Sequence, residues 1–132
     1  MNYLLDTNFY IQILNQKESQ AARKLASISP QDVRLCSVVK AELFHDAYKS
    51  GRESNLNLVR SFFALFESLP FDEHAAEIYG SLRTDLEKRG NPIGPNDLLI
   101  ASIALANNVT LVTHNASEFS RIATLPIEDW QI

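Results

Sequence analysis

Short apolar runs alternate with longer stretches of helix-spaced apolar residues through the sequence. Apolar runs stand at 3–5 and 33–36, and the clearest strand signal is 110–113. Stretches with helical spacing separate these runs. Because short buried strands separated by helices pair in parallel through right-handed crossovers, this order predicts a three-layer α/β/α fold with a central parallel sheet.

The helical stretches have recognisable ends. Six segments are expected as helices: 9–14, 21–28, 37–51, 56–66, 72–90 and 97–107. Ser37 and Asp72 are expected to cap their helices, and Gly51 is expected to end one. The run 69–71 is at most a short edge strand, because Pro70 has no N–H to donate.

Two of the predicted helices carry more apolar residues than one buried stripe needs. The surplus residues are Phe9 and Ile11 in the first helix and Phe62, Phe63 and Phe66 in the fourth. One interpretation is a large hydrophobic core. The other is an apolar groove for a partner segment, together with a self-complementary face that forms a dimer.

Length and composition describe one ordinary globular domain over residues 1–132. The chain is 45% hydrophobic and 21% charged, which excludes a disordered or collagen-like protein. Its single cysteine, Cys36, excludes an intramolecular disulfide, and we expect it to be a buried small residue in a reducing cytoplasm. The apolar runs are too short for a membrane span, and the first residues do not resemble a signal peptide.

The net charge of −4 disfavours a protein that holds nucleic acid by bulk positive charge. The acidic residues can instead gather at a divalent cation. Asp6 and Asn115 follow the first and last predicted strands, at the edge where open parallel sheets place their sites. Asp97 lies in the first turn of a helix, and Glu42 lies in the second turn of another, off its apolar stripe.

Each of these residues also has an ordinary structural interpretation, as a helix cap, a helix-dipole partner, a solvated side chain or a turn former. Together they suggest chemistry. Three carboxylates held close together repel one another, and Mg²⁺ with its oxygen ligands keeps them ionised. A water bound to such an ion can attack a phosphodiester, so hydrolysis of RNA is the hypothesis that the residues support.

Several motifs resemble those of PIN-domain ribonucleases and, more narrowly, of VapC toxins from bacterial VapBC toxin–antitoxin pairs. The matching segments span almost the whole chain: Leu-Leu-Asp-Thr-Asn at 4–8, Glu42, Ile-Gly-Pro-Asn-Asp-Leu-Leu-Ile-Ala at 93–101, and Leu-Val-Thr-His-Asn at 111–115, followed by Glu118. The resemblance implies a PIN-like α/β/α domain with an acidic pocket that binds one or two Mg²⁺ or Mn²⁺ ions and cleaves RNA.

The resemblance also implies roles for individual residues. Asp6, Glu42 and Asp97 take the positions of catalytic and metal-binding acids. Asn115 stands at the fourth acidic position of the wider family, where an amide removes one negative charge and weakens the case for a second metal. Glu118, one turn on, is expected to replace that acid in part. Thr7, Asn8, Ser37 and Thr113 are the expected supporting residues around the acids.

Substrate and partners follow from the same resemblance. VapC-like toxins cut structured RNA at a loop, and this chain most resembles members that cut the anticodon stem-loop of initiator tRNA and so arrest translation. A cognate VapB-type antitoxin, a homodimer and a higher assembly with the antitoxin are expected. The expected phosphate contacts, each of which also fits a solvated charge, are Lys40, Arg83, Lys88, Arg89 and Arg121.

Other functions fit parts of the pattern. A phosphotransferase with an aspartyl-phosphate intermediate, or a signalling receiver domain, also places an acid after its first strand. Both need a second acid nearby and a later lysine, whereas Asn8 and the segment Thr113–Asn115 stand at those places. A non-catalytic PIN-like module that binds RNA or protein is the stronger alternative, because Asn115 departs from the acidic pattern.

Overall fold

A five-stranded parallel sheet forms the centre of the structure, a computed structural model that describes residues 1–15 and 18–131. The chain runs from the central strand β1 outward to β2 and β3, then returns to the other side of β1 for β4 and β5. The parallel sheet predicted from the sequence is confirmed. In spatial order the strands are β3 (Glu67–Leu69), β2 (Val33–Cys36), β1 (Tyr3–Leu5), β4 (Thr110–Val112) and β5 (Ile127–Glu128).

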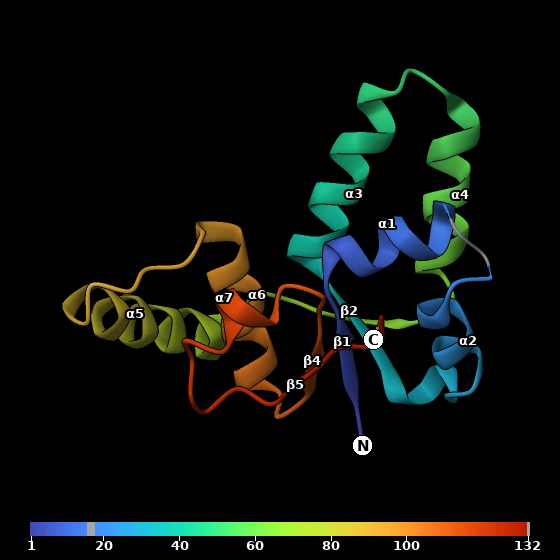
Figure 1. Ribbon diagram of the computed structural model, residues 1–132. Coiled ribbons are helices and arrows are strands. Elements are labelled where there is room, and N and C mark those ends of the chain that lie inside the picture. Colours follow the sequence, from blue (N-terminus) through green and yellow to red (C-terminus); the bar gives the residue numbers. More distant parts are fainter. Residues whose placement is uncertain (16–17, 132) are drawn as a thin grey trace.

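Helices flank this sheet on two sides, which confirms the α/β/α architecture. Figure 1 shows α5 and α6 on one side of the strands and α1 and α2 on the other. Helices α3 and α4 form a hairpin that rises beyond the carboxyl ends of the strands, here called the α3–α4 arm. The helices are α1 (Thr7–Asn15), α2 (Gln20–Ala26), the 3₁₀ turn η1 (Pro30–Asp32), α3 (Ser37–Lys49), α4 (Glu53–Phe63), α5 (Glu73–Lys88), α6 (Pro95–Ala106) and α7 (Ala116–Phe119).

Local signals set some of the helix ends. The Asp72 carboxylate accepts a hydrogen bond from the Ala75 N–H at 3.0 Å, and Gly51 ends α3 with a φ of 68°. The cap predicted at Ser37 is wrong. Strand β2 runs directly into α3, so Cys36 takes the extended cap position and Ser37 is already the first helical residue.

Other boundaries also differ from the prediction. Helix α4 ends at Phe63, so Phe66 lies outside it, and α2 already ends at Ala26. The edge strand β3 covers 67–69 instead of 69–71, since Pro70 cannot continue a ladder. Neither β5 nor the four-residue α7 was expected. β5 is held by hydrogen bonds from the N–H groups of β4 and its flanking residues, which no local sequence signal reveals.

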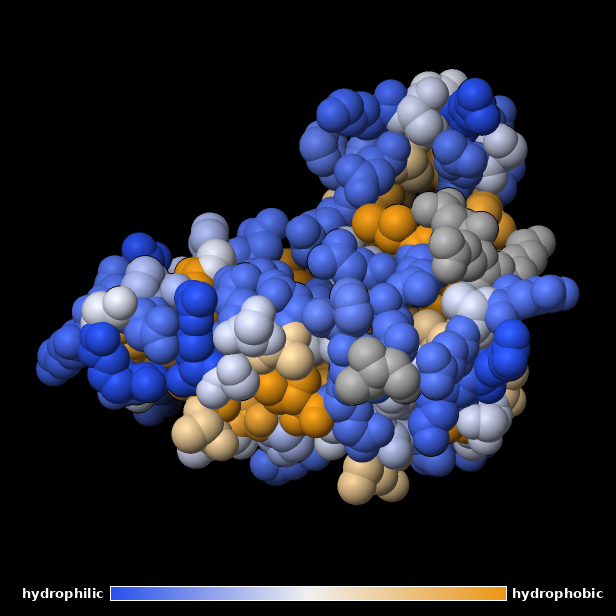
Figure 2. Space-filling model, in the orientation of Figure 1, coloured by the Kyte–Doolittle hydropathy of each residue, from blue (hydrophilic) through white to orange (hydrophobic). Residues whose placement is uncertain are grey.

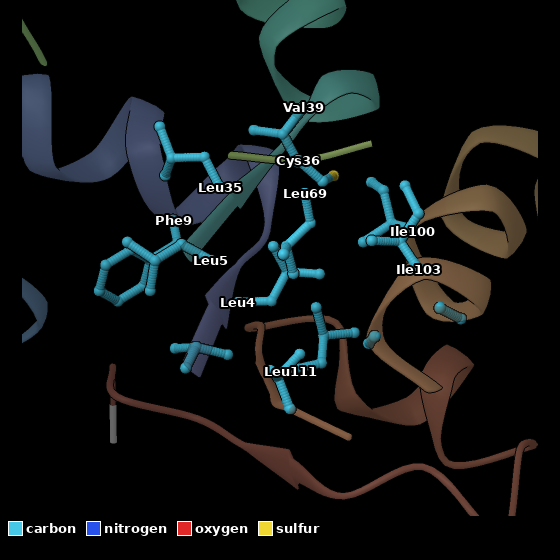
Figure 3. Close-up of a cluster of buried hydrophobic side chains, with 14 of the residues drawn as sticks. Leu4, Leu5, Phe9, Leu35, Cys36, Val39, Leu69, Ile100, Ile103 and Leu111 are labelled. Atoms are coloured by element: carbon cyan, nitrogen blue, oxygen red, sulfur yellow. The ribbon is translucent and has the colours of Figure 1, made fainter. Parts of the chain in front are cut away.

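The sheet is buried between the helix layers. Leu4 and Leu5 of β1 and Leu111 of β4 are completely buried, and Ile100 and Ile103 of α6 pack beside them (Figure 3). Continuous apolar strands of this kind are expected where both faces of a parallel sheet are covered.

Cys36, at the end of β2, belongs to the same core. It is a free cysteine with no exposed surface, and burial raises the pKa of its thiol to about 11. The expectation of a buried small residue is confirmed. A thiol that stays protonated at neutral pH is a poor nucleophile.

An aromatic cluster joins α1 to the α3–α4 arm. The rings of Tyr10 and Phe62 meet edge to face with centroids 4.6 Å apart, and Phe44 and Phe63 do so at 5.1 Å. These phenylalanines therefore serve the core, the first of the two interpretations left open. The hydroxyl of Tyr10 is buried and has no hydrogen-bond partner among the described residues.

That hydroxyl gives a test of the packing. Replacing Tyr10 by Phe keeps the ring and removes a buried polar group that nothing in the described chain satisfies. We expect the free energy of unfolding to rise by about 1 kcal/mol in urea denaturation. Tyr79→Phe is the matched control, because the Tyr79 hydroxyl is exposed and accepts a hydrogen bond from Arg83. A clear loss of stability in Tyr10→Phe would show that this hydroxyl has a partner.

Candidate active site

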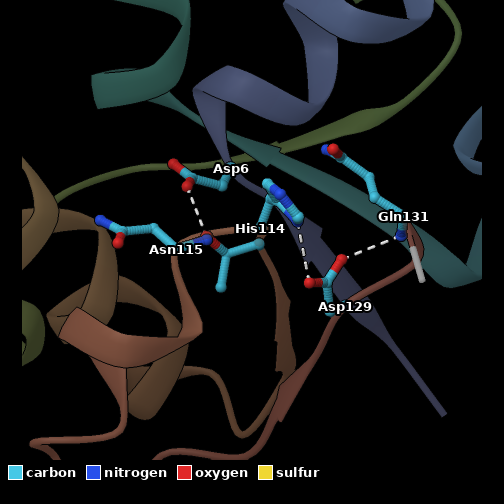
Figure 4. A network of polar contacts seen from close by, with 6 residues as sticks. Asp6, His114, Asn115, Asp129 and Gln131 are labelled. Atoms are coloured by element: carbon cyan, nitrogen blue, oxygen red, sulfur yellow. Dashed lines mark hydrogen bonds and ion pairs between the residues drawn. The ribbon is translucent and has the colours of Figure 1, made fainter.

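Asp6 is the most buried acid of the site. It stands directly after β1, and its side chain is fixed by two donors: the Thr7 N–H at 2.7 Å and the Thr113 hydroxyl at 2.8 Å. Figure 4 shows Asp6 near Asn115, which follows β4. Burial raises the pKa of Asp6, the Thr113 hydrogen bond opposes that rise, and the charge of Glu42 adds to it. The first and fourth strands therefore hold this carboxylate between them.

Glu42 reaches the same place from the α3–α4 arm. Its Oε1 accepts a hydrogen bond of 2.7 Å from the hydroxyl of Thr7. The helical spacing predicted that Glu42 would point away from the buried stripe formed by Val39, Leu43 and Ala47, and this is what the structure has. Thr7 thus contacts two carboxylates, one through its backbone and one through its side chain.

Asp97 and Glu118 complete the group. Glu118 accepts hydrogen bonds from the Gly94 N–H and from the Asn115 amide, each at 2.8 Å. The Gly94 contact is the main reason that the pKa of Glu118 is lowered. Burial, followed by repulsion from Asp6 and Glu118, raises the pKa of Asp97 to about 7. Glu118 therefore lies at the acid cluster, as expected of a partial replacement for the acid missing at Asn115.

Four carboxylates meet here without a neutralising partner. In the described part of the chain, none of them forms an ion pair with a lysine, arginine or histidine. Carboxylate and amide oxygens with uncompensated negative charge are the donors that hard divalent cations prefer. As the side chains stand, no three His, Cys, Asp or Glu residues of the described chain form a group that could hold a metal ion. The chemistry of the donors fits a divalent cation, and their present arrangement is held by hydrogen bonds instead.

Two hollows adjoin the acids. One, of about 430 Å³, is lined in part by Ser37, Glu42 and His45 on α3 and contains the expected supporting residue Ser37. The other, of about 340 Å³, contains the expected supporting residue Asn8 and shares Asn115 with the acidic site. Neither Ser37 nor Asn8 donates a side-chain hydrogen bond to the acids within the described residues.

The expected RNA-binding cations are spread over the molecule. Arg83 on α5 and Arg89, the residue that follows α5, form ion pairs with Glu87 and Asp85 respectively, each one helical turn away. Lys88 lies between them and is exposed. In the part of the chain that the structure describes, none of these three cations forms an ion pair or hydrogen bond with the acidic cluster.

Only one of the two remaining cations approaches the acids. Arg121 donates to the Pro92 carbonyl at 2.7 Å, and its charge helps to lower the pKa of Glu118. The Lys40 ammonium lies 5.2 Å above the centre of the Phe63 ring, a cation–π contact on the arm. Among the five candidates, Arg121 is therefore the best placed to meet a phosphate at the site.

A hydrophobic groove lies apart from the acids, between α1 and the α3–α4 arm. Figure 2 shows hydrophobic residues gathered at the base of the arm. The groove encloses about 270 Å³ and is lined mainly by Ile11, Leu43, Ala47, Leu58 and Val59. Ile11 and Leu58 remain 38% and 48% exposed, so the aromatic core leaves apolar surface uncovered here.

The topology places the acids at the point where the strand order reverses, between β1 and β4, the usual site of open α/β sheets. The PIN domain family matches residues 3–125 of this chain. The chain belongs to that family. Its relatives include "Ribonuclease VapC2" of Rickettsia felis, 39% identical, and the "tRNA(fMet)-specific endonuclease VapC" of Salmonella typhimurium, 34% identical; each match covers 98% of both chains. The resemblance to PIN-domain ribonucleases of the VapC type is confirmed.

Solved structures give the same result. The chain superposes with a TM-score of 0.91 on VapBC2 from Rickettsia felis bound to a DNA fragment from its promoter, at 39% identity, covering 98% of this chain and 99% of the other. The DNA-bound VapBC of Salmonella typhimurium gives 0.92 at 34% identity, covering 98% of each. The PIN-like fold prediction is confirmed. In the part of the chain that the structure describes, no helix is long and apolar enough to cross a membrane.

Sequence reasoning missed three polar residues at this edge of the sheet: Gln12, Asp129 and Gln131. Asp129 lies 2.9 Å from the ring of His114, a residue to which the sequence analysis gave no role at the site. Asp129 follows β5 as His114 follows β4, so both residues come after a strand of the sheet. The position of Asp129 could be predicted only if the two-residue strand at 127–128 were already known.

The crowding of acids predicts how stability changes with pH when EDTA removes metal. Between about pH 5 and about pH 8 the folded protein retains the Asp97 proton to higher pH than the unfolded chain, so stability falls as pH rises through this range. We expect the midpoint of thermal unfolding to decrease accordingly, and to decrease less in Asp97→Asn. Asp32→Asn serves as control, because Asp32 directly precedes β2 and so lies at the amino-terminal ends of the strands, away from the acids. Equal pH dependence in Asp97→Asn and the parent protein would contradict the raised pKa that burial, followed by repulsion from Asp6 and Glu118, gives Asp97.

Proposed function

We propose that this chain, as one PIN domain, is a divalent-metal-dependent endoribonuclease that acts as the toxin of a toxin–antitoxin pair in the cytoplasm. The observation that carries the proposal is the convergence of Asp6, Glu42, Asp97 and Glu118 at the strand-order reversal, where none of the four forms an ion pair with a described residue. Acidic residues that repel one another are often found together at functional sites, and a metal-assisted hydrolase uses such a cluster to bind its cation. The names of the relatives support the same reaction.

The cation would be Mg²⁺ or Mn²⁺, held by Asp6, Asp97 and Glu42 with the amide oxygen of Asn115. When bound, it would neutralise the carboxylates and make an attacking water more acidic. The chain's own contribution is orientation. Thr113 and the Thr7 N–H fix the Asp6 carboxylate, while the Thr7 hydroxyl fixes Glu42. Of the three acids, Glu42 is the one that reaches the site from the arm, which suits it to orient water.

The substrate that this proposal names is a loop of a structured RNA. The Salmonella typhimurium relative is called a tRNA(fMet)-specific endonuclease, which supports the anticodon stem-loop of initiator tRNA as the target. Bases splayed out of a loop are accessible to protein side chains, unlike bases inside an A-form groove. Arg121 is the proposed phosphate contact beside the acids; the roles of Lys40, Arg83, Lys88 and Arg89 stay predictions.

Cleavage of total bacterial RNA by the purified protein tests the activity directly. With Mg²⁺ we expect discrete cuts whose ends map to one loop, and EDTA should abolish them. Asp97→Asn should lower the cleavage rate at least about 100-fold, because losing a metal ligand costs more than losing the groups behind it. Primer extension maps the fragment ends, and Asp32→Asn is the control that should cut like the parent.

Two results would reject the nuclease. Cuts that persist in EDTA and in Asp97→Asn would come from a contaminant. A folded protein that binds RNA and cuts none in Mg²⁺ or Mn²⁺ would favour the alternative of a non-catalytic binding module.

The partner in this proposal is a VapB-type antitoxin, whose apolar segment occupies the groove at the base of the α3–α4 arm. VapBC complexes are the solved structures that this chain matches, which supports the partnership. Apolar residues of three helices line the groove, and two of them, Ile11 on α1 and Leu58 on α4, are exposed, so an apolar segment seated there would remove their apolar surface from water. The homodimer expected from the family stays a prediction.

A charge placed in the groove tests this part separately. Leu58→Arg should weaken co-purification with a VapB-type antitoxin at least about tenfold, since an apolar contact would have to bury a charge. RNA cleavage should be unchanged. Leu65→Arg is the matched control, because Leu65 is 61% exposed and does not line the groove. Equal antitoxin binding by Leu58→Arg and the parent would place the antitoxin elsewhere.

A further inference from the structure

The smaller hollow beside the acids is built almost entirely from amide side chains. Asn8 and Gln12 come from α1, His114 and Asn115 follow β4, and Gln131 lies beyond β5. No Asp, Glu, Lys or Arg lines it within the described residues. This hollow is therefore polar yet free of carboxylates, in contrast to the acidic site with which it shares Asn115.

The histidine in this hollow is held in one orientation. The Nδ1 atom of His114 lies 2.9 Å from one oxygen of Asp129, and the other oxygen accepts the Gln131 N–H at 2.9 Å (Figure 4). Because an ionised carboxylate can only accept hydrogen bonds, Nδ1 carries the proton. The flat ring and its Nε2 atom are left for a ligand.

Three of the amides are also uncommitted. Asn115 donates to Glu118, whereas the side chains of Asn8, Gln12 and Gln131 have no hydrogen-bond partner among the described residues. In Figure 4 the Gln131 side chain extends toward the His114 ring. Each free amide offers two donors and an acceptor, the combination with which Asn and Gln read the edge of a base such as adenine.

We propose that this hollow binds the base of the nucleotide next to the cleaved bond, and that Gln12 and Gln131 determine which base is accepted. The inference rests on the proposed ribonuclease function. Asn115 supplies the link, because it lines the hollow and is hydrogen-bonded to Glu118 at the acids. A nucleotide whose base sits in the hollow therefore has its phosphate close to them.

A base fits this hollow better than a phosphate does. A volume of about 340 Å³ lies at the lower end of the range for small-ligand pockets, suited to one base. Among the described residues of the lining a phosphate would meet no lysine or arginine, and it would lie beside carboxylates that repel it. A base has none of these penalties, and its face can stack on the His114 ring as bases do on aromatic side chains in RNA-binding proteins.

Binding measurements test the inference without requiring catalysis. In an Asp97→Asn background, fluorescence anisotropy with short labelled oligonucleotides of A, C, G or U should give one base an affinity at least about tenfold higher than the weakest. Gln12→Ala and Gln131→Ala should each reduce this preference to within about threefold while leaving the weakest oligonucleotide unaffected. Gln31→Ala is the matched control, since Gln31 is an exposed amide on η1, at the opposite edge of the sheet.

The outcomes separate this inference from the proposed function. A base preference that is lost in the Gln12→Ala and Gln131→Ala variants supports the base pocket even if the parent protein cuts no RNA, and in that case only the nuclease fails. Cleavage by the parent, with four oligonucleotides bound equally or with the preference intact in both variants, overturns the base pocket alone. A hollow that serves an antitoxin segment instead would give this second result. Unchanged unfolding midpoints show that each variant is folded.

Discussion

The burial of carboxylates that also repel one another is the constraint that the rest of this structure must accommodate. Asp6 is only 3% exposed and lies among three other acids, so each charge raises the cost of its neighbours. The fold meets part of this cost with donors placed at fixed points: a threonine hydroxyl after β4, the N–H of Thr7 at the start of α1, and the N–H of Gly94 before α6. The cluster is therefore a property of backbone geometry as much as of acidic residues.

That geometry follows from the strand order. Since β1 is central and the chain leaves it in one direction and returns on the other, the segments after β1 and β4 become neighbours although 107 positions separate Asp6 from Thr113. The first turn of α6 and the second turn of α3 reach the same edge. The apolar strands keep this edge rigid because they are buried on both faces.

Much of this arrangement was predictable from the sequence. Strand ends followed by Asp6 and Asn115, and a helix start at Asp97, placed the acids at one edge of a parallel sheet, and helical spacing gave the direction of Glu42. The pairing of Glu118 with the Gly94 N–H was not predictable, because the two residues are brought together only by the packing of α7 against the loop before α6.

The prediction from the sequence also failed for short secondary-structure elements. A two-residue strand such as β5 is too brief for any periodicity, so the residues after it could not be assigned to the site edge. The Ser37 cap failed for a related reason: local preference favours serine at a cap, but the direct passage of β2 into α3 leaves no room for one. In both cases the structure depends on the packing of the sheet and not on the few neighbouring residues from which the element was predicted.

The hydrogen bond between Thr7 and Glu42 has a mechanical consequence. It joins α1 to α3 at the acidic site, and the same two helices form walls of the hydrophobic groove at the other end of their contact. The angle between α1 and α3 thus affects both the acidic site and the hydrophobic groove. A bound segment that changes this angle at the groove therefore also acts on the Thr7–Glu42 hydrogen bond, and a change at the acids acts on the groove in return.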